Sequence, residues 1–315
     1  MASRSASAPP DSLAPDIIAL GEPLFEFNRR AGDEGLWLEG HGGDTSNAAI
    51  AAARQGARAG YLTAIGDDIF GASFLDLWRR ERVDASRVPL DREAPTGLYF
   101  VTHGPAGHEF SYRRAGSAAS RLSPAALPED YLGAAKYLHV SGISQAVMGP
   151  VVDRALDMAR SRKVTISYDT NLRLKLWPLD RARAAIHANV AKADIVFTSI
   201  DEAEQLTGRN EPDLIADFYL GLGPRVIAVK LGAAGVFLVA QGRGQQFAGH
   251  KVEAVDATGA GDVFAGTFLA ELAAGRDPFA AAAYANAAAA LSTTGYGAVA
   301  PIPRRPAVEA LLKGR

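Results

Sequence analysis

Short apolar runs rich in β-branched and aromatic residues recur along the chain, each bounded by turn residues. They predict strands at residues 16–20, 60–65, 137–140, 164–169, 194–199, 226–230 and 235–240. Segments with the helical spacing of apolar positions lie between most of them, at residues 45–55, 72–82, 150–162, 180–192, 202–206 and 213–221. Two further predicted helices, 261–274 and 278–292, follow one another without a strand between them. Strands that alternate with crossover helices predict an α/β fold with a mostly parallel central sheet and helices on both faces.

Two segments do not fit this alternation. Residues 37–39 and the alternating stretch 96–113 have the spacing of strands that lie outside the main sheet. We assign them to a small inserted β lid, with strands from about residues 23–41 and 97–113. Residues 16–315, with this lid included, are predicted to form one domain. Residues 1–15 are rich in Ser, Ala and Pro and lack the apolar core of a secretory signal, so we expect a disordered leader.

Composition narrows the class of protein. The 315 residues are 48% hydrophobic and 22% charged, which is typical of a folded protein, and the net charge of -2 gives no case for nucleic acid or an anionic membrane as partner. The absence of cysteine excludes disulfides and thiolate catalysis and fits the cytoplasm, where we place the protein. Residues 278–303 carry no charged side chain, but they are mostly small, which predicts a buried helix rather than a membrane span.

The strongest candidate for chemistry is the run Asp-Ala-Thr-Gly-Ala-Gly-Asp at residues 256–262, at the start of a predicted helix. Gly259, Ala260 and Gly261 are small enough for backbone N–H groups to converge on an anion at the helix N-terminus. Asp262 could stabilise the first helical turn. Alternatively, it could take a proton from an alcohol while a phosphoryl group is transferred to that alcohol. Spacing alone leaves both roles open.

A second glycine-rich run precedes the predicted helix 45–55. Gly43 could form a turn in front of the helix, with Asp44 or Thr45 as the N-cap. Glycine also permits close approach by a ligand, and Asn47, one turn into the helix, could then donate to a sugar hydroxyl.

These two runs carry a family resemblance. Residues 256–262 resemble the second signature of the ribokinase-like (PfkB) carbohydrate kinases, and residues 42–49 resemble their first signature. The resemblance implies a ribokinase-like fold and an ATP-dependent kinase that phosphorylates a sugar hydroxyl. It implies residues 259–261 as the anion hole, Asp262 as the catalytic base, and Gly43, Asp44 and Asn47 at the substrate. ATP and Mg²⁺ are the implied cofactors, and a monovalent cation is left open.

The resemblance extends to a nucleotide site. Lys230, Gly232 and Gly235 match the strand-end turn that lies near ATP in the family, although the residues alone indicate only a hairpin turn. Ser199 stands where the Asn of the family's Asn-x-x-Glu motif is usual, and we place it in the nucleotide site. Glu202, the Glu of that motif, is implied in an indirect contact with magnesium, or is simply an exposed acid in the first turn of a helix. Asn286 is placed like residues that line the adenine pocket, or is a core amide.

Two arginine-containing segments concern the phosphate acceptor. One contributes Asn171 and Arg173 after a predicted strand, and the other contributes Tyr112 and Arg114 from the lid. The guanidinium fork matches a carboxylate well, although an Arg after a strand is often a surface ion-pair partner. Together with Tyr99, these residues resemble the branch of the family that phosphorylates 2-dehydro-3-deoxygluconate. The resemblance implies that they bind this sugar acid, with both arginines at its carboxylate, and that the acid is phosphorylated on its 6-hydroxyl.

Three other functions stay open. A fructokinase or another neutral-sugar or nucleoside kinase of the same family would leave the two arginines incidental. A non-catalytic sugar-binding or nucleotide-binding homologue would have no need of a base at Asp262. A dinucleotide oxidoreductase is disfavoured because Gly21-Glu22-Pro23, after the first strand, is not a GxGxxG fingerprint. We expect small-molecule partners, the sugar acid and ATP, and a homo-oligomer.

Overall fold

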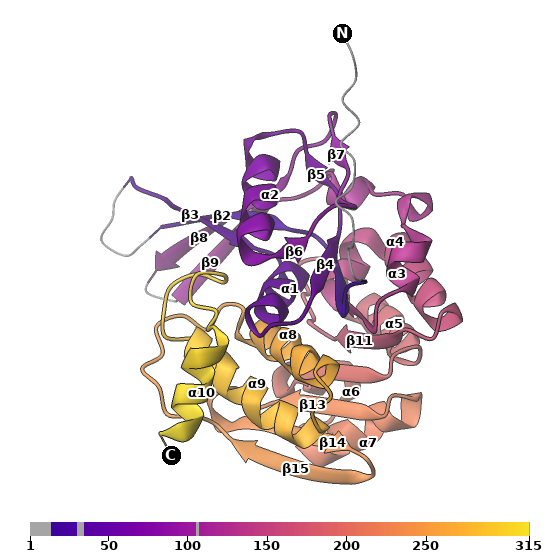
Figure 1. Ribbon diagram of the computed structural model, residues 1–315, viewed down its shortest axis with the longest axis vertical. Helices are drawn as coiled ribbons and strands as arrows, with labels where there is room; N and C mark the ends of the chain where they lie inside the picture. Colours follow the sequence, from indigo (N-terminus) through magenta and orange to yellow (C-terminus); the bar gives the residue numbers. More distant parts are fainter. Residues whose placement is uncertain (1–13, 30–34, 105–106, 315) are drawn as a thin grey trace.

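A nine-stranded sheet forms the centre of the computed structural model, which describes residues 14–29, 35–104 and 107–314 (Figure 1). Its strands lie in the order β15 (Arg243–Ala248), β14 (Gly235–Ala240), β13 (Val226–Lys230), β12 (Ile195–Ser199), β11 (Thr165–Asp169), β10 (Tyr137–Ser141), β1 (Ile17–Leu20), β4 (Ala59–Leu62) and β6 (Val83–Asp84). Neighbouring strands are parallel from β6 to β13, whereas β14 and β15 pair antiparallel at one edge. The predicted mostly parallel sheet is confirmed. The predicted leader lies outside the described residues except for residues 14 and 15.

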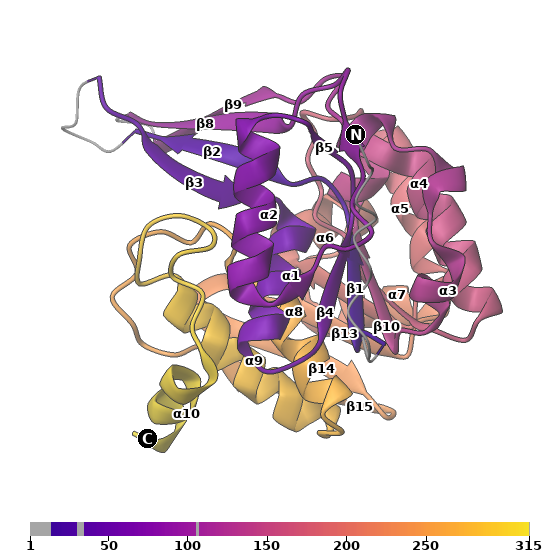
Figure 2. The ribbon, with the colours of Figure 1, turned by 45° about the horizontal axis from the view of Figure 1, so that its top comes forward.

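Helices cover both faces of this sheet (Figure 2). One face packs against α1 (Asp44–Arg54), α2 (Ile69–Glu81), α8 (Ala260–Ala273), α9 (Pro278–Ser292) and α10 (Arg305–Lys313). The other packs against α3 (Glu129–Gly133), α4 (Gly142–Ser161), α5 (Leu179–Val190), α6 (Ile200–Thr207) and α7 (Pro212–Leu222). In β1, the side chains of Ile17 and Ala19 are buried on the first face, and those of Ile18 and Leu20 on the second. Because the strand is buried on both faces, all of its residues are apolar. Within the described ranges, no helix has both the length and the apolar character needed to cross a membrane.

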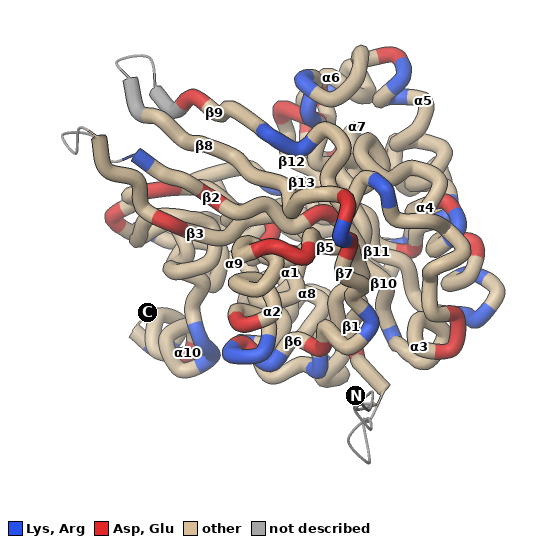
Figure 3. Tube along the Cα trace, turned by 90° about the horizontal axis from the view of Figure 1, so that it is seen from above, with Lys and Arg blue, Asp and Glu red and all other residues tan. Residues whose placement is uncertain are grey.

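A second sheet projects beyond the carboxyl end of β1. Its four strands are ordered β3 (Leu38–Gly42), β2 (Leu24–Asn28), β8 (Gly97–Gly104) and β9 (Gly107–Arg113). They overlap the two segments assigned to the lid, with β3 ending one residue later, and Figure 2 shows them extending away from the helices. Seen from above in Figure 3, Lys and Arg positions are interspersed with Asp and Glu positions around the molecule, as the small net charge suggests. The described residues also include three short 3-10 turns, at Ala119–Arg121, Pro124–Ala126 and Gly232–Ala234.

The predicted strand 60–65 is wrong at its end. β4 ends at Leu62, and Ile65 belongs to β5 (Ile65–Gly66), which pairs with β7 (Leu90–Asp91) in a separate two-stranded sheet. The Gly66 amide donates to Thr96 Oγ1 at 3.0 Å, which holds the chain away from the main sheet. A continuous apolar pattern does not reveal such a change of sheet.

The predicted helix 150–162 begins too late. α4 starts at Gly142 and contains a break at Met148, whose φ of -134° and ψ of 40° are not helical. Proline has no N–H and its ring crowds the preceding turn, so Pro150 interrupts the helix without preventing a turn before it. The sequence pattern also missed β15, because most of its residues are exposed and polar at the sheet edge.

The close crossing of α1 and α8 positions part of the site described below. A Cβ atom on Gly266 would lie 2.0 Å from the carbonyl oxygen of Ala48, so only glycine permits this approach. Asn47 precedes Ala48 on α1, and Asp262 lies one turn before Gly266 on α8. The contact therefore brings two side chains together that are 215 positions apart in the sequence.

We expect Gly266→Ala to lower the free energy of unfolding by about 1–3 kcal/mol, because the added methyl group must push the two helices apart. In an ordinary helix the same change is stabilising, by about 1 kcal/mol. Gly221→Ala in α7 is the matched control, since no atom lies within 4 Å of its would-be Cβ. Urea unfolding of both variants measures the difference. Equal stability of Gly266→Ala and the wild type would contradict the helix contact.

Candidate active site

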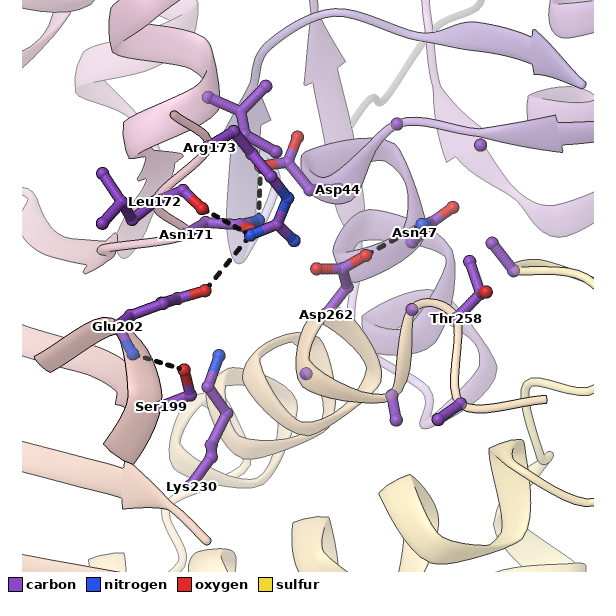
Figure 4. Close-up of a pocket in the computed structure, with 18 of the residues that line it drawn as sticks. Asp44, Asn47, Asn171, Leu172, Arg173, Ser199, Glu202, Lys230, Thr258 and Asp262 are labelled. Carbon is purple, nitrogen blue, oxygen red and sulfur yellow. Dashed lines mark hydrogen bonds and ion pairs between the residues drawn. The ribbon is translucent and has the colours of Figure 1, made fainter. Parts of the chain in front are cut away.

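A pocket of about 950 Å³ lies between the second sheet and the carboxyl ends of the main-sheet strands. This is the edge at which parallel sheets bind ligands. Every candidate site residue from the sequence contributes to its wall: Gly43, Asp44, Asn47, Tyr99, Tyr112, Arg114, Asn171, Arg173, Ser199, Glu202, Lys230, Gly232, Gly235, Gly259, Ala260, Gly261, Asp262 and Asn286. Figure 4 shows the central part of this arrangement.

Asp262 lies in the first turn of α8, where its carboxylate faces α1 (Figure 4). Asn47 Nδ2 donates to Asp262 Oδ2 at 2.9 Å and so fixes the carboxylate plane, with Oδ1 left for another partner. Burial and the neighbouring Asp44 carboxylate raise the pKa of Asp262 well above the usual value of an aspartate. A carboxylate with a raised pKa is better suited to accept a proton than an ordinary aspartate.

The residues before Asp262 form a compact turn. Gly259 is the N-cap of α8 with a φ of 78°, a left-handed conformation that favours glycine. A Cβ on Gly261 would lie 3.0 Å from Lys230 Nζ, so the ammonium group is next to this backbone. Lys230 also pairs with Asp169 at 2.7 Å. The amides of the first turn, the helix dipole and Lys230 together favour an anion here. The Ala260 amide already donates to Ala257 at 3.2 Å and could only share its proton with that anion.

Buried acceptors face the pocket beside Asp262. Asn171 Nδ2 donates to Asp44 Oδ2 at 3.0 Å, which holds Asp44 in place. Asp44 Oδ1 and Asn47 Oδ1 have no hydrogen-bond partner among the described residues. Buried acceptors of this kind require donors, and the hydroxyl groups of a ligand would supply them. The expected N-cap of α1, Asp44 or Thr45, is wrong: the cap is Gly43, whose φ of 108° and contact with the Glu22 backbone exclude a side chain.

The two predicted arginines occupy different surroundings. Arg114, which follows β9, donates from Nε to Glu22 Oε2 at 2.7 Å, and its Nη2 also pairs with that oxygen. Arg173, which follows β11, donates from Nη1 to Glu202 at 3.2 Å and to the Leu172 carbonyl at 2.8 Å. Each guanidinium therefore has a carboxylate partner, one beneath the second sheet and one on α6.

Two tyrosines of the second sheet form a wall of the pocket. The rings of Tyr99 and Tyr112 stack with their centroids 6.1 Å apart, and the Tyr99 hydroxyl donates to Glu26. The Arg114 guanidinium lies 5.6 Å from the centre of the Tyr112 ring. The guanidinium thus lies over the Tyr112 ring, and the two rings and this cation belong to the same wall of the pocket.

The other side of the pocket has the polar groups assigned to the nucleotide. Ser199 caps α6 by accepting from the Glu202 amide at 3.3 Å, which gives Ser199 a structural reason of its own. Gly235 has a φ of 105°, and a Cβ there would meet the Phe247 carbonyl, so the hairpin of β14 and β15 requires this glycine. Asn286 Nδ2 donates to the Ala248 carbonyl at 2.8 Å, as expected of a core amide, although the side chain also lines the pocket.

The sequence profile of the pfkB family of carbohydrate kinases matches residues 19–305. The chain belongs to this family. The chain is 36% identical to 2-dehydro-3-deoxygluconokinase of Thermoproteus tenax over 94% of both chains. It is 33% identical to probable fructokinase-4 of Arabidopsis thaliana, over 95% of this chain and 97% of the other. The structure of a putative ribokinase II from E. coli in complex with ATP and Mg²⁺ is 26% identical, has a TM-score of 0.88, and covers 96% of this chain and all of that one.

The site of this pfkB kinase suits an indirect magnesium contact. No group of three or more His, Asp or Glu side chains in the described ranges has metal-binding geometry. Glu202 Oε1 accepts from Arg173, and Oε2 accepts from Thr170 at 2.9 Å, so both oxygens already have protein partners. Mg²⁺ usually retains several waters and binds one or two carboxylates together with phosphates. Both oxygens of Glu202 are therefore better suited to a magnesium contact through water than to direct coordination.

Glu22 also lines the pocket, although the sequence did not single it out. Its carboxylate is fully buried at the end of β1 and accepts from Arg114 on one oxygen and from Ser117 Oγ on the other. Burial raises the pKa of Glu22, and the Arg114 charge opposes this effect. Glu22 lies where the chain leaves the main sheet, and Arg114 lies where it returns. The signal in the sequence was a lone acid after an apolar strand, but its partner is 92 positions away.

We expect Glu22→Gln to raise the KM for an acidic sugar about 10-fold, on the scale of a hydrogen bond to a charged group, and to leave the KM for a neutral sugar unchanged. An amide presents an N–H to Arg114 in one of its orientations, so the guanidinium loses its fixed direction. Ser117→Ala is the control, because it removes a donor to Glu22 but leaves the Arg114 pair intact. Steady-state kinetics with both sugars check this. Equal changes for acidic and neutral sugars would mean that Glu22 acts only through folding.

Proposed function

We propose that this pfkB kinase phosphorylates the 6-hydroxyl of 2-dehydro-3-deoxy-D-gluconate with ATP. The observation that carries the proposal is the combination, in one pocket, of Arg114 with the Oδ1 atoms of Asp44 and Asn47, which have no partner in the part of the chain that the structure describes. Cation and acceptors match a ligand that has a carboxylate and several hydroxyls. The relative from Thermoproteus tenax, named for this substrate, supports the same assignment.

The nucleotide half of the proposal rests on the first turn of α8 and on the residues around it. The amides of residues 259–261 and the Lys230 ammonium would bind the phosphates, and Gly232, Gly235, Ser199 and Asn286 would border the nucleotide. Mg²⁺ bound with ATP would neutralise charge on the phosphates, with Glu202 holding it through water. The E. coli ribokinase structure with ATP and Mg²⁺ supports this use of the fold.

Asp262 would serve as the general base. In the proposed step, the C6 oxygen forms a bond to the γ-phosphorus while its proton passes to Asp262. The bond from that phosphorus to the bridging oxygen breaks, and its electron pair stays with ADP. Asn47 holds Oδ2, so Oδ1 is the oxygen free to receive the proton. The products are the 6-phosphate, ADP and a proton that Asp262 later releases to water.

A neutral-sugar kinase is the second candidate. The match to a fructokinase at 33% identity favours it. So does the Glu22 carboxylate, which balances the Arg114 charge without any ligand. A coupled assay of ADP formation with 2-dehydro-3-deoxygluconate, fructose, ribose and adenosine separates the candidates. We expect the highest kcat/KM with the sugar acid; a higher value with fructose would replace our proposal with the second candidate.

The proposal includes the cytoplasm as the compartment, because a cysteine-free chain fits reducing conditions, and a homo-oligomer as the assembly. Light scattering after size-exclusion chromatography measures the assembly directly.

A further inference from the structure

We propose that Arg173 binds the phosphoryl group during its transfer and not the carboxylate of the sugar, which makes Arg173 a catalytic residue. The inference rests on the proposed function for the direction in which the sugar lies, and on the described contacts for the rest. It departs from the sequence-based expectation that Arg114 and Arg173 hold the same carboxylate.

The surroundings of Arg173 are those of the reaction centre. Its guanidinium points into the space between Glu202, Asp44 and Asp262 (Figure 4). Nη1 is held by Glu202 at 3.2 Å and by the Leu172 carbonyl at 2.8 Å. The side chain is 49% exposed, so the rest of the guanidinium remains open to the pocket. A ligand atom could reach it without breaking the contact with Glu202.

The charges around Arg173 also indicate that it lies at the reaction centre. Although partial desolvation opposes its charge, the carboxylates of Glu202, Asp262 and Asp44 raise the pKa of Arg173 above the usual arginine value. Arg173 is therefore within electrostatic reach of the base itself. Asp262 must touch the attacking hydroxyl, so the transferred phosphoryl group must pass beside Asp262. Arg173 and Lys230 both line the pocket, and the Lys230 ammonium lies beside the backbone of Gly261, which precedes Asp262.

The length of the sugar indicates that the two arginines contact different ends of it. The 6-hydroxyl and the carboxyl carbon lie at opposite ends of a six-carbon chain, so a molecule with C6 at Asp262 has its carboxylate elsewhere. Arg114, beneath the second sheet beside Tyr112, is the cation for that far end.

Arg173 would act on charge that develops during transfer. As the phosphorus moves from the bridging oxygen of ADP to the C6 oxygen, negative charge spreads over its three equatorial oxygens. A guanidinium already fixed by Glu202 and the Leu172 carbonyl can bind those oxygens without reorganising. It takes no proton in this step, because Asp262 receives the proton of the hydroxyl.

The test compares Arg173→Ala and Arg173→Lys with Arg114→Ala. We expect Arg173→Ala to lower kcat by about 100- to 1,000-fold on acidic and neutral sugars alike, the scale of a lost transition-state donor. Titration calorimetry without nucleotide should give a wild-type Kd for the sugar acid. Arg173→Lys should recover part of kcat, because it restores the charge without the fork. Arg114→Ala should show the opposite pattern, with a raised Kd for the acid only.

A transition-state mimic provides a second readout that a structural role would not move. With sugar present, the wild type should bind ADP with aluminium fluoride more tightly than ADP alone, and Arg173→Ala should lose this difference while binding ADP normally. A raised Kd for the acid with normal kcat on a neutral sugar would overturn the inference and return Arg173 to the carboxylate. If the wild type does not use the sugar acid, the proposed function fails, whereas the loss of kcat can still be measured on any sugar that the wild type accepts.

Discussion

Replacement of Asp262 by Asn is expected to lower kcat by at least ~100-fold while the Kd values for sugar and ATP stay close to those of the wild type. The amide keeps the size of the side chain, but it cannot take the proton of the attacking hydroxyl. Asn47 still has an oxygen to donate to, so the local structure should persist. Steady-state kinetics and calorimetry on the purified variant measure the two quantities. Near-normal turnover by a folded variant would exclude Asp262 as the base.

The pH dependence of the wild type gives an independent check of the same residue. Because the base must be ionised, kcat/KM should fall as the pH drops through the pKa of Asp262, and burial and Asp44 place that pKa well above an ordinary aspartate value. Asp44→Asn removes a negative charge and should move the midpoint of this decline to lower pH, whatever it does to the maximum rate. A midpoint at the usual value of about 3.9 would contradict the described electrostatics.

Features formed by neighbouring residues could be predicted from the sequence, whereas contacts between residues far apart in the sequence could not. Gly259, Ala260, Gly261 and Asp262 are contiguous, so the turn and the first helical residues could be predicted from their order alone. The contact between Asp262 and Asn47 requires the close crossing of α1 and α8. That crossing depends on the absence of a side chain at Gly266 and not on any motif. Periodicity describes one element at a time, and it carries no information about such a crossing.

The partners of charged residues were the least predictable feature. The sequence singled out Arg114 and Arg173 as a pair, yet Glu22 and Glu202 place them in different environments. Arg113 is next to Arg114 in the sequence and carries the same charge, but the two side chains differ in position. The structure exposes Arg113, whose Nη1 donates to the Tyr112 carbonyl at 3.0 Å, and directs Arg114 to the pocket. Such choices follow from the pairing of β8 with β9, which determines the side of the sheet that each residue occupies.

Replacement of Arg114 by Ala is expected to raise the KM for the sugar acid by roughly 10- to 150-fold, from about 1.5–3 kcal/mol for charge-assisted hydrogen bonds. Activity on a neutral sugar should barely change. Arg113→Ala is the matched control, because this exposed neighbour has the same charge and should leave both sugars unaffected.

The Arg114→Ala variant leaves the buried Glu22 carboxylate without a cation. Removing one partner of a buried ion pair costs about 3–5 kcal/mol of stability, so a second variant is needed to separate binding from folding. The double variant Glu22→Gln/Arg114→Ala removes both charges and should regain much of that stability. If the acid-selective rise in KM persists in the double variant, it comes from the missing guanidinium and not from a damaged fold. If instead the double variant binds acidic and neutral sugars as the wild type does, Arg114 has no role at the carboxylate, and the neutral-sugar kinase becomes the better description of the protein.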